Sequence, residues 1–215
     1  MKTGIIVIDP GHGGVENVGG SDANHAVSAL GDLEKNLTLE IGILIADELR
    51  LKTHQVYLTR DTDTNLSLQN RAALALTKKA DVFLSIHFNG WTDTTTQGTE
   101  TYVYPGASSD SVLLASSVQQ RLVQATGYKD RKVKEMKLGV LNPAYHFSKT
   151  ACALAEISFI TETNDAKRLR NLAYKNSLAK ALSVAVDDFI NKHSGIKEIK
   201  VQPQLNLLKA EDSDI

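Results

Sequence analysis

The sequence predicts an α/β fold, a three-layer α/β/α sandwich with a mostly parallel central sheet of about six strands. Short runs of apolar or β-branched residues alternate along the chain with longer segments of helical periodicity. Such runs are typical of strands that are covered on both faces. Because parallel neighbours need crossover connections, the alternating order favours helices on both sides of a parallel sheet.

Strands and helices can be assigned to residue ranges. The expected strands are residues 4–9, 55–59, 82–87, 100–104 and 153–159, with a weaker candidate near 139–141. Helices are expected at residues 37–49, 72–76, 111–125 and 178–189. In each, the apolar residues are spaced to face one side of a helix, which can pack against a core. Ser108, Ser109 and Asp110 are N-cap candidates for the third helix, and the fourth is expected to stop near Gly195.

Length and charge limit the kind of protein. The 215 residues suffice to bury one substantial core, so we expect one domain over residues 1–195. Residues 196–215 have no sustained period and end acidic, which indicates a linker or tail. The 24 Lys and Arg against 25 Asp and Glu give a net charge of -1. We therefore expect no nucleic-acid partner and no membrane insertion. We also expect a monomer. The single Cys152 lies in an apolar run and is expected to be buried.

Two histidines are expected at the carboxyl ends of strands, where ligands collect in open α/β sheets. His12 lies in the turn Asp-Pro-Gly-His-Gly-Gly after the first strand, and His87 closes the strand at residues 82–87. Taken singly, His12 could hydrogen-bond within its turn and His87 could cap its strand. Two imidazoles at one edge favour a metal site, and the glycines leave room beside the imidazole. The turn lacks the spacing of phosphate-binding glycine loops.

A third ligand candidate is Glu34. A catalytic zinc site typically has three N or O protein ligands and one open position for water, and a carboxylate suits the third place. Glu34 stands at the front of the first helix, with Asp32 as a plausible cap. In the alternative reading, the Glu34 carboxylate only complements the helix dipole.

Glu156 is a carboxylate in the middle of a strand that otherwise reads as buried. Burying an unpaired carboxylate is costly, so Glu156 must be ion-paired, protonated or directed into a cleft that holds a cation. One reading is a structural ion pair with Arg60 or Arg71, which are otherwise expected to pair with Asp61, Asp63 or other carboxylates. The other reading is a general base that takes a proton from water at a metal site.

Several residues near these positions carry further expectations. His25 and His54 are expected to be solvated. His146 is a candidate for contact with the substrate. Asn89 and Trp91 follow the second histidine and could line a cleft, although Trp91 could equally pack against the strand end.

Seven segments stand in a fixed order over residues 4 to about 190. They read IIVIDPGHGG, GDLEKNLTLEIG, LTRDTD with LSLQNRAALA, ADVFLSIHFNGW, GTETYVY, LGVL and AEISFITETNDAKRL. Together they resemble the zinc-dependent N-acetylmuramoyl-L-alanine amidases, a family of cell-wall hydrolases. The resemblance implies that His12, Glu34 and His87 bind one Zn²⁺ ion. It also implies that Glu156 is the catalytic residue.

The resemblance implies an activity and a place of action. The expected activity is hydrolysis of the amide between N-acetylmuramic acid and L-alanine of the stem peptide, with peptidoglycan as the partner. The alternatives are a catalytically inactive peptidoglycan-binding regulatory module of the same fold and a zinc enzyme that acts on another amide. All four site positions are filled, which argues against the inactive module.

The substrate lies outside the cytoplasmic membrane, so the periplasm or the extracellular cell wall is the expected location. A phage-encoded lysis enzyme is the alternative. The apolar run from Ile5 to Ile8 is shorter than the roughly 7 to 15 residues of a signal-peptide core, so no signal peptide is expected in this chain. The segment between His87 and Glu156 is too short for the autoinhibitory helical insertion of some members, so the site is expected to be open without an activator.

Overall fold

The central sheet fixes the arrangement of the chain in the computed structural model, which describes residues 2–193, 208 and 209. Its strands are β1 (Ile5–Pro10), β2 (Gln55–Leu58), β3 (Val82–Asn89), β4 (Thr99–Val103), β5 (Asp130–Glu135), β6 (Ala151–Phe159) and β7 (Leu208–Lys209). The strand order is β2-β1-β3-β6-β4-β5-β7. Only the pairing of β4 with β6 is antiparallel among these strands, so the predicted mostly parallel sheet is confirmed.

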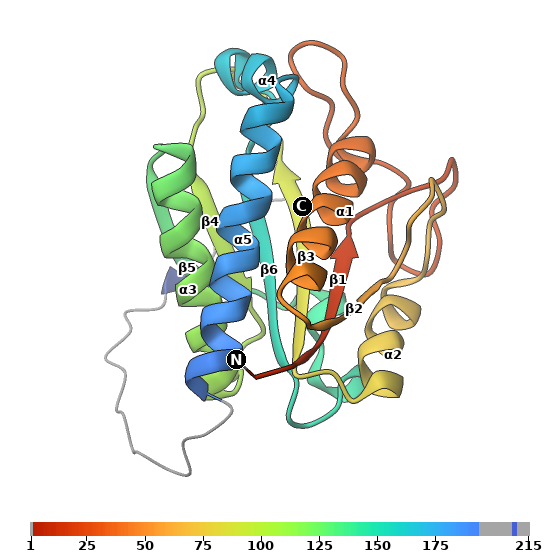
Figure 1. Ribbon diagram of the computed structural model, residues 1–215. Coiled ribbons are helices and arrows are strands. Elements are labelled where there is room, and N and C mark those ends of the chain that lie inside the picture. The colour runs from red at the N-terminus through yellow and green to blue at the C-terminus, as the bar shows by residue number, and fades with distance from the viewer. Residues whose placement is uncertain (1, 194–207, 210–215) are drawn as a thin grey trace.

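Helices lie on both faces of this sheet. They are α1 (Glu34–Leu51), α2 (Leu68–Lys78), α3 (Ser109–Thr126), α4 (Thr163–Leu169) and α5 (Leu172–His193). Helices α1, α3 and α5 lie side by side over one face (Figure 1). On the other face, α2 and two single-turn helices, Gly139–Leu141 and Pro143–Tyr145, cover part of the sheet. The three-layer α/β/α architecture is therefore as predicted.

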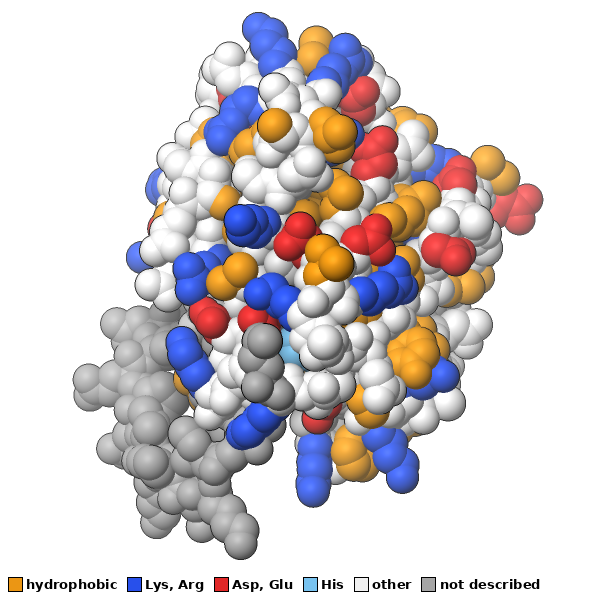
Figure 2. Space-filling model, viewed as in Figure 1, with side chains coloured by type: hydrophobic (Ala, Val, Ile, Leu, Met, Phe, Trp, Pro, Cys, Tyr) orange, Lys and Arg blue, Asp and Glu red, His pale blue; other side chains and the backbone are white. Residues whose placement is uncertain are grey.

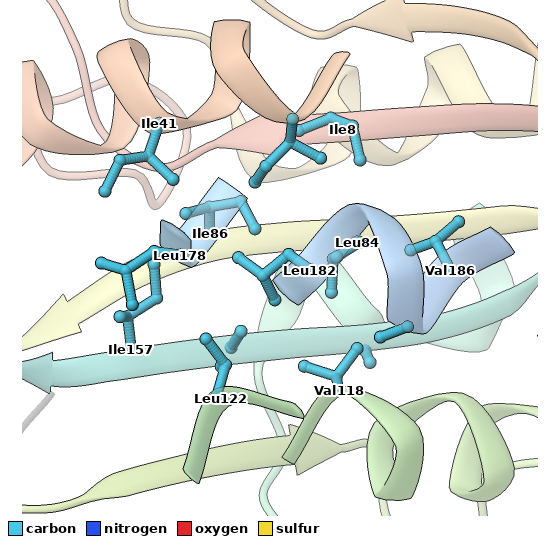
Figure 3. Packing of buried hydrophobic residues seen from close by; sticks show 14 of the residues in the cluster. Ile8, Ile41, Leu84, Ile86, Val118, Leu122, Ile157, Leu178, Leu182 and Val186 are labelled. Atoms are coloured by element: carbon cyan, nitrogen blue, oxygen red, sulfur yellow. The ribbon is translucent and has the colours of Figure 1, made fainter. Parts of the chain in front are cut away.

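The larger core lies between the sheet and the three long helices. Figure 3 shows Leu178 and Leu182 of α5 directed toward the sheet. There they pack near Leu84 and Ile86 of β3 and Ile157 of β6, all of which are buried. The outer surface of this side carries acidic and basic side chains interspersed (Figure 2). Among the described residues, no helix has the length and apolar content needed to cross a membrane.

Three assignments of secondary structure differ from the expectation. Residues 139–141 form a 3-10 turn rather than a strand, and Val140 and Leu141 are buried there against the α2 side of the sheet. Strand β5 was not predicted, because its sequence DRKVKE has only one buried side chain and no apolar run. Helix α4 was also missed, since seven residues are too few to show a clear period. The expected N-cap Ser108 is confirmed, because its side chain accepts a hydrogen bond from Ser111 N.

His54 is buried, so the prediction of a solvated side chain was wrong. Its Nδ1 accepts a hydrogen bond from the backbone N–H of Gly4 at 3.1 Å. Its Nε2 lies 3.1 Å from Oδ1 of Asp187 on α5. The imidazole therefore joins the start of β1 to the last helix, and its acidic partner lies far along the chain. The linker or tail expected at residues 196–215 falls outside the described residues, except that residues 208 and 209 pair with β5.

Candidate metal centre

A cleft of about 270 Å³ opens at the carboxyl ends of β1, β3 and β6. His12, Glu34, His87 and Glu156 all line this cleft. The parallel register of β3 and β6 pairs His87 with Glu156, which places both side chains on the same face of the sheet. The cleft lies on the face that α2 and the single-turn helices only partly cover, and no α3 residue lines it. The topology thus collects all four predicted side chains in one place.

Glu34 stands between the two histidines. Its Oε1 lies 3.2 Å from Nε2 of His12 and 3.2 Å from Nδ1 of His87. One ligand atom from each of these residues lies within 4.8 Å of the other two. The two imidazole rings meet edge to face with centroids 4.8 Å apart. The three side chains therefore present two nitrogens and one oxygen toward a common point.

This arrangement fits a zinc ion. Bonds of about 2.0–2.1 Å in a tetrahedral geometry require ligand atoms roughly 3.3 Å apart, close to the two 3.2 Å separations. Two imidazole nitrogens and one carboxylate oxygen also form a donor set found at catalytic zinc sites. His12 Nδ1 lies 3.0 Å from the carbonyl oxygen of Asp22. If Nδ1 carries the proton and donates it there, the lone pair on Nε2 faces the centre.

The Glu34 carboxylate is held in place by the backbone. Its Oε2 accepts a hydrogen bond from Ala26 N–H and its Oε1 accepts one from Phe88 N–H, both at 3.0 Å. Burial opposes ionisation of Glu34, but hydrogen bonds and charges from His12 and His87 outweigh burial and lower its pKa. Glu34 is therefore an anionic group fixed between two imidazoles.

Asp32 does not cap α1, so that expectation was wrong. Residue Leu33 occupies the N-cap position and makes no side-chain capping hydrogen bond. Asp32 instead accepts hydrogen bonds from the Ser28 hydroxyl and the Arg170 guanidinium. These contacts stabilise the loop that leads into α1, and Ala26 of that loop donates to Glu34.

Two buried arginines hold the turn that carries His12. Arg71 donates hydrogen bonds to the carbonyl oxygens of Pro10 and His12, both at 2.7 Å. Arg60 donates to the carbonyl oxygens of Pro10 at 2.9 Å and Gly11 at 2.8 Å. His12 itself has a φ of 61°, an uncommon left-handed conformation for a residue with a side chain. The turn therefore depends on these surrounding hydrogen bonds.

Of the two arginines, Arg71 pairs with a carboxylate other than Asp61 and Asp63, as expected, whereas Arg60 forms no ion pair within the described residues. Arg71 pairs with Asp9 of β1 at 2.9 Å, and Arg60 mainly contacts backbone carbonyls instead of Asp61 or Asp63. Asp63 pairs with Lys35 at 2.8 Å. Sequence reasoning did not single out Asp9, although it ends an apolar strand three residues before the metal-site histidine. Neither arginine pairs with the Glu156 carboxylate, so the structural ion pair considered for that residue is wrong.

Glu156 lies beside the three candidate ligands. It is 3% exposed, and its Oε2 has no hydrogen-bond partner among the described residues. Along the sheet it is flanked by His87 on β3 and Glu100 on β4. Burial raises the pKa of Glu156, and the negative charges of Glu34 and Glu100 raise it further. A buried carboxyl with an unpartnered oxygen, in the same cleft as the candidate ligands, is suited to proton transfer.

The remaining expectations have mixed outcomes. Asn89 lines the cleft, whereas Trp91 is 51% exposed and does not line it. His25 is exposed as expected, but it also lines the cleft with its ring stacked 6.2 Å from that of His12. His146 is buried outside the main cleft, where its Nε2 lies 2.7 Å from the carbonyl oxygen of Val140. The buried state of Cys152 is confirmed.

Gly11 gives a direct test of how tightly the centre is packed. A Cβ atom at this position would lie 2.2 Å from Cε1 and 2.4 Å from Nε2 of His87. Gly11→Ala must therefore displace the His87 ring, and we expect zinc affinity to fall about 10- to 100-fold, as for other disturbances around metal ligands. Competition with a chromogenic chelator measures this affinity.

The matched control is Gly106→Ala, because a Cβ atom there meets nothing within 4 Å. Gly106 has a φ of 74°, so this substitution carries backbone strain but lies outside the metal site. It should leave zinc affinity unchanged. Wild-type zinc affinity in Gly11→Ala would show that the His87 ring does not take part in the site.

An α/β sandwich that brings two imidazoles and two carboxylates together at its strand ends has the architecture of a metal-dependent hydrolase. The family model described as N-acetylmuramoyl-L-alanine amidase matches residues 6–188 of this chain. The chain therefore belongs to the N-acetylmuramoyl-L-alanine amidase family.

Individual relatives agree with this assignment. N-acetylmuramoyl-L-alanine amidase LytC of Bacillus subtilis (strain 168) is 35% identical over 180 residues, which are 82% of this chain and 34% of LytC. The chain thus spans about a third of the length of that relative. The sporulation-specific N-acetylmuramoyl-L-alanine amidase of the same organism is 31% identical over 202 residues, 91% of this chain and 73% of that protein. The crystal structure of an N-acetylmuramoyl-L-alanine amidase from Clostridium difficile 630 has a TM-score of 0.79 and 30% identity, covering 89% of this chain and 98% of that one.

Proposed function

We propose that this chain is a zinc-dependent amidase that cleaves the bond between N-acetylmuramic acid and L-alanine of the peptidoglycan stem peptide. The observation that carries the proposal is the convergence of His12, Glu34 and His87 beside the buried, unpartnered carboxylate of Glu156. Membership of the amidase family supports this choice of bond over another amide.

In this proposal His12, Glu34 and His87 hold one zinc ion. When bound, zinc supplies a Lewis acid for the amide carbonyl and lowers the pKa of water toward about 7. Hydrogen bonds with the backbone orient these ligands for metal binding. The Asp22 carbonyl orients the His12 ring, and backbone N–H groups of Ala26 and Phe88 orient the Glu34 carboxylate.

Glu156 is proposed as the general base. Its carboxylate takes a proton from the attacking water and passes this proton to the departing amine nitrogen of L-alanine. The raised pKa of Glu156 suits this exchange, because the carboxylate binds a proton more strongly than an exposed glutamate does. The side chains of Leu68, Leu138 and Leu154 add apolar surface to the lining of the cleft.

A digest of purified peptidoglycan tests the proposed activity. The full chain, supplied with zinc, should release intact stem peptides that carry a free L-alanine amino terminus, and mass spectrometry identifies this product. A peptidase would release shortened stems, and a deacetylase would release acetate and leave the stems attached. A catalytically inactive binding module would sediment with the polymer and release no product. Any of these three results would overturn the assignment.

The place of action and the extent of the domain are also proposals. We propose that the protein acts as a monomer on the wall, outside the cytoplasmic membrane, in the periplasm or the extracellular wall. A phage-encoded lysis enzyme would use the same substrate and the same site. We also propose a catalytic domain over residues 1–195, which the match of the family model to residues 6–188 supports.

A further inference from the structure

Strand β5 contains a bulge that places two cations on the face of the sheet where the metal centre lies. Thr99 pairs with Asp130 and Thr101 with Val133, so β5 holds one residue more than β4 over this stretch. Lys132 within the bulge has a φ of 74°. In a regular strand, residues three apart point to opposite faces, and a bulge changes this alternation.

The bulge lets Arg131 and Lys134 reach the same oxygen. Arg131 Nε lies 2.9 Å and Lys134 Nζ lies 2.6 Å from Oε2 of Glu100. Two positive charges therefore share one carboxylate, and the group keeps a net positive charge. Glu100 is buried and pairs across the sheet with Glu156, the proposed general base. Their side chains remain 30% and 16% exposed.

Lys137, three residues after Lys134, is a further cation, and it lies at the cleft. It follows the end of β5 and lines the cleft together with His12 and Glu156. Its side chain is exposed, and within residues 2–193, 208 and 209 it makes no hydrogen bond or ion pair. We call Arg131, Lys134 and Lys137 the basic strip. The strip comprises one unpaired cation at the cleft and two further cations, outside the cleft lining, that Glu100 holds in place.

The proposed substrate has a matching charge. Beyond L-alanine, the stem peptide continues with a glutamate joined through its side-chain carboxyl, so its α-carboxyl is either a free carboxylate or an amide. A free carboxylate one residue from the scissile bond would enter the cleft that Lys137 lines together with His12 and Glu156. Charge-assisted contacts between an ammonium and a carboxylate are stronger than neutral hydrogen bonds.

We propose that the basic strip binds this carboxylate of the stem peptide, with Lys137 in direct contact and Arg131 and Lys134 adding positive potential behind it. The inference rests on the proposed function, because it assumes a stem peptide in the cleft. It makes the enzyme selective for stems whose second residue is not amidated, and it directs the peptide toward β5.

Two soluble muropeptides that differ only in this group test the inference, one with a free α-carboxylate and one with the amide. The wild-type chain should cleave the free acid with the lower KM. Lys137→Ala should raise KM for the free acid about tenfold, the size expected for loss of one charged contact, and should leave KM for the amide nearly unchanged. Lys137→Arg should retain most of the preference. Added salt should reduce the preference of the wild type.

Lys129→Ala is the matched control, because Lys129 is also an exposed lysine beside β5 but does not line the cleft. It should leave the preference intact. If the wild type cleaves neither muropeptide, the proposed function itself fails. If the wild type cleaves both, and Lys137→Ala changes both KM values equally or neither, the basic strip does not read the carboxylate and this inference is overturned.

Discussion

Glu156→Gln is expected to lower the rate of peptidoglycan hydrolysis by about 100- to 10,000-fold, the usual contribution of a general base. The amide has nearly the shape of the carboxylate but cannot take a proton from water. Because Glu156 is not among the three candidate metal ligands, zinc affinity should stay close to that of the wild type. Release of dye from labelled peptidoglycan measures the rate, and metal analysis of the purified protein measures zinc.

His87→Ala separates a role in metal binding from a role in proton transfer. His87 pairs with Glu156 across the sheet but belongs to the candidate ligand set, so this variant should lose zinc and activity together. A Glu156→Gln enzyme that hydrolyses at the wild-type rate would remove Glu156 from the mechanism. Loss of zinc from Glu156→Gln would instead make it a metal ligand.

The convergence of the site could be predicted because strand ends meet in a parallel sheet. His12 follows one apolar run and His87 closes another. Local sequence therefore indicates that both lie at the carboxyl ends of strands, which form one edge of a parallel sheet. Glu156 stood out because a carboxylate interrupts a buried strand. The structure adds what fixes these groups, such as the bonds from Ala26 and Phe88 to Glu34. Those donors are backbone groups. Ala26 lies in a loop that carries no periodic pattern, and the sequence of β3 does not indicate which carboxylate the N–H of Phe88 meets.

The features that sequence reasoning missed depend on distant partners or on charged segments. His54 looked like a loop histidine, because the Asp187 carboxylate that holds it lies on the last helix. Strand β5 looked like a loop, because charged residues dominate its sequence and only one of its side chains is buried. Sequence reasoning did not single out Lys137. Its place in the cleft follows from the path of the chain after β5, which no local spacing indicates.

Arg71→Met is expected to destabilise the fold by about 3–5 kcal/mol, the cost of removing one partner from a buried ion pair. Arg71 and Asp9 are 1% and 0% exposed, and their charged atoms lie 2.9 Å apart. The substitution leaves the Asp9 carboxylate buried beside the hydroxyls of Thr59 and Ser85. It also removes the hydrogen bonds to the carbonyls of Pro10 and His12, so zinc affinity should fall as well. Urea unfolding measures the loss of stability.

The control is Arg50→Met, which removes an exposed ion pair with Asp47 and should lower the free energy of unfolding by about 0.2–1 kcal/mol.

Unfolding at acid pH gives a second test of the buried pair between Arg71 and Asp9. Burial alone would raise the pKa of Asp9, but the Arg71 charge and two hydroxyl hydrogen bonds lower it. A lowered folded-state pKa stabilises the fold above the unfolded value of about 3.9, and this stabilisation is lost as pH falls through the folded value. Asp9→Asn should lack that acid-dependent component. Equal losses in Arg71→Met and Arg50→Met would show that the buried pair does not hold the His12 turn.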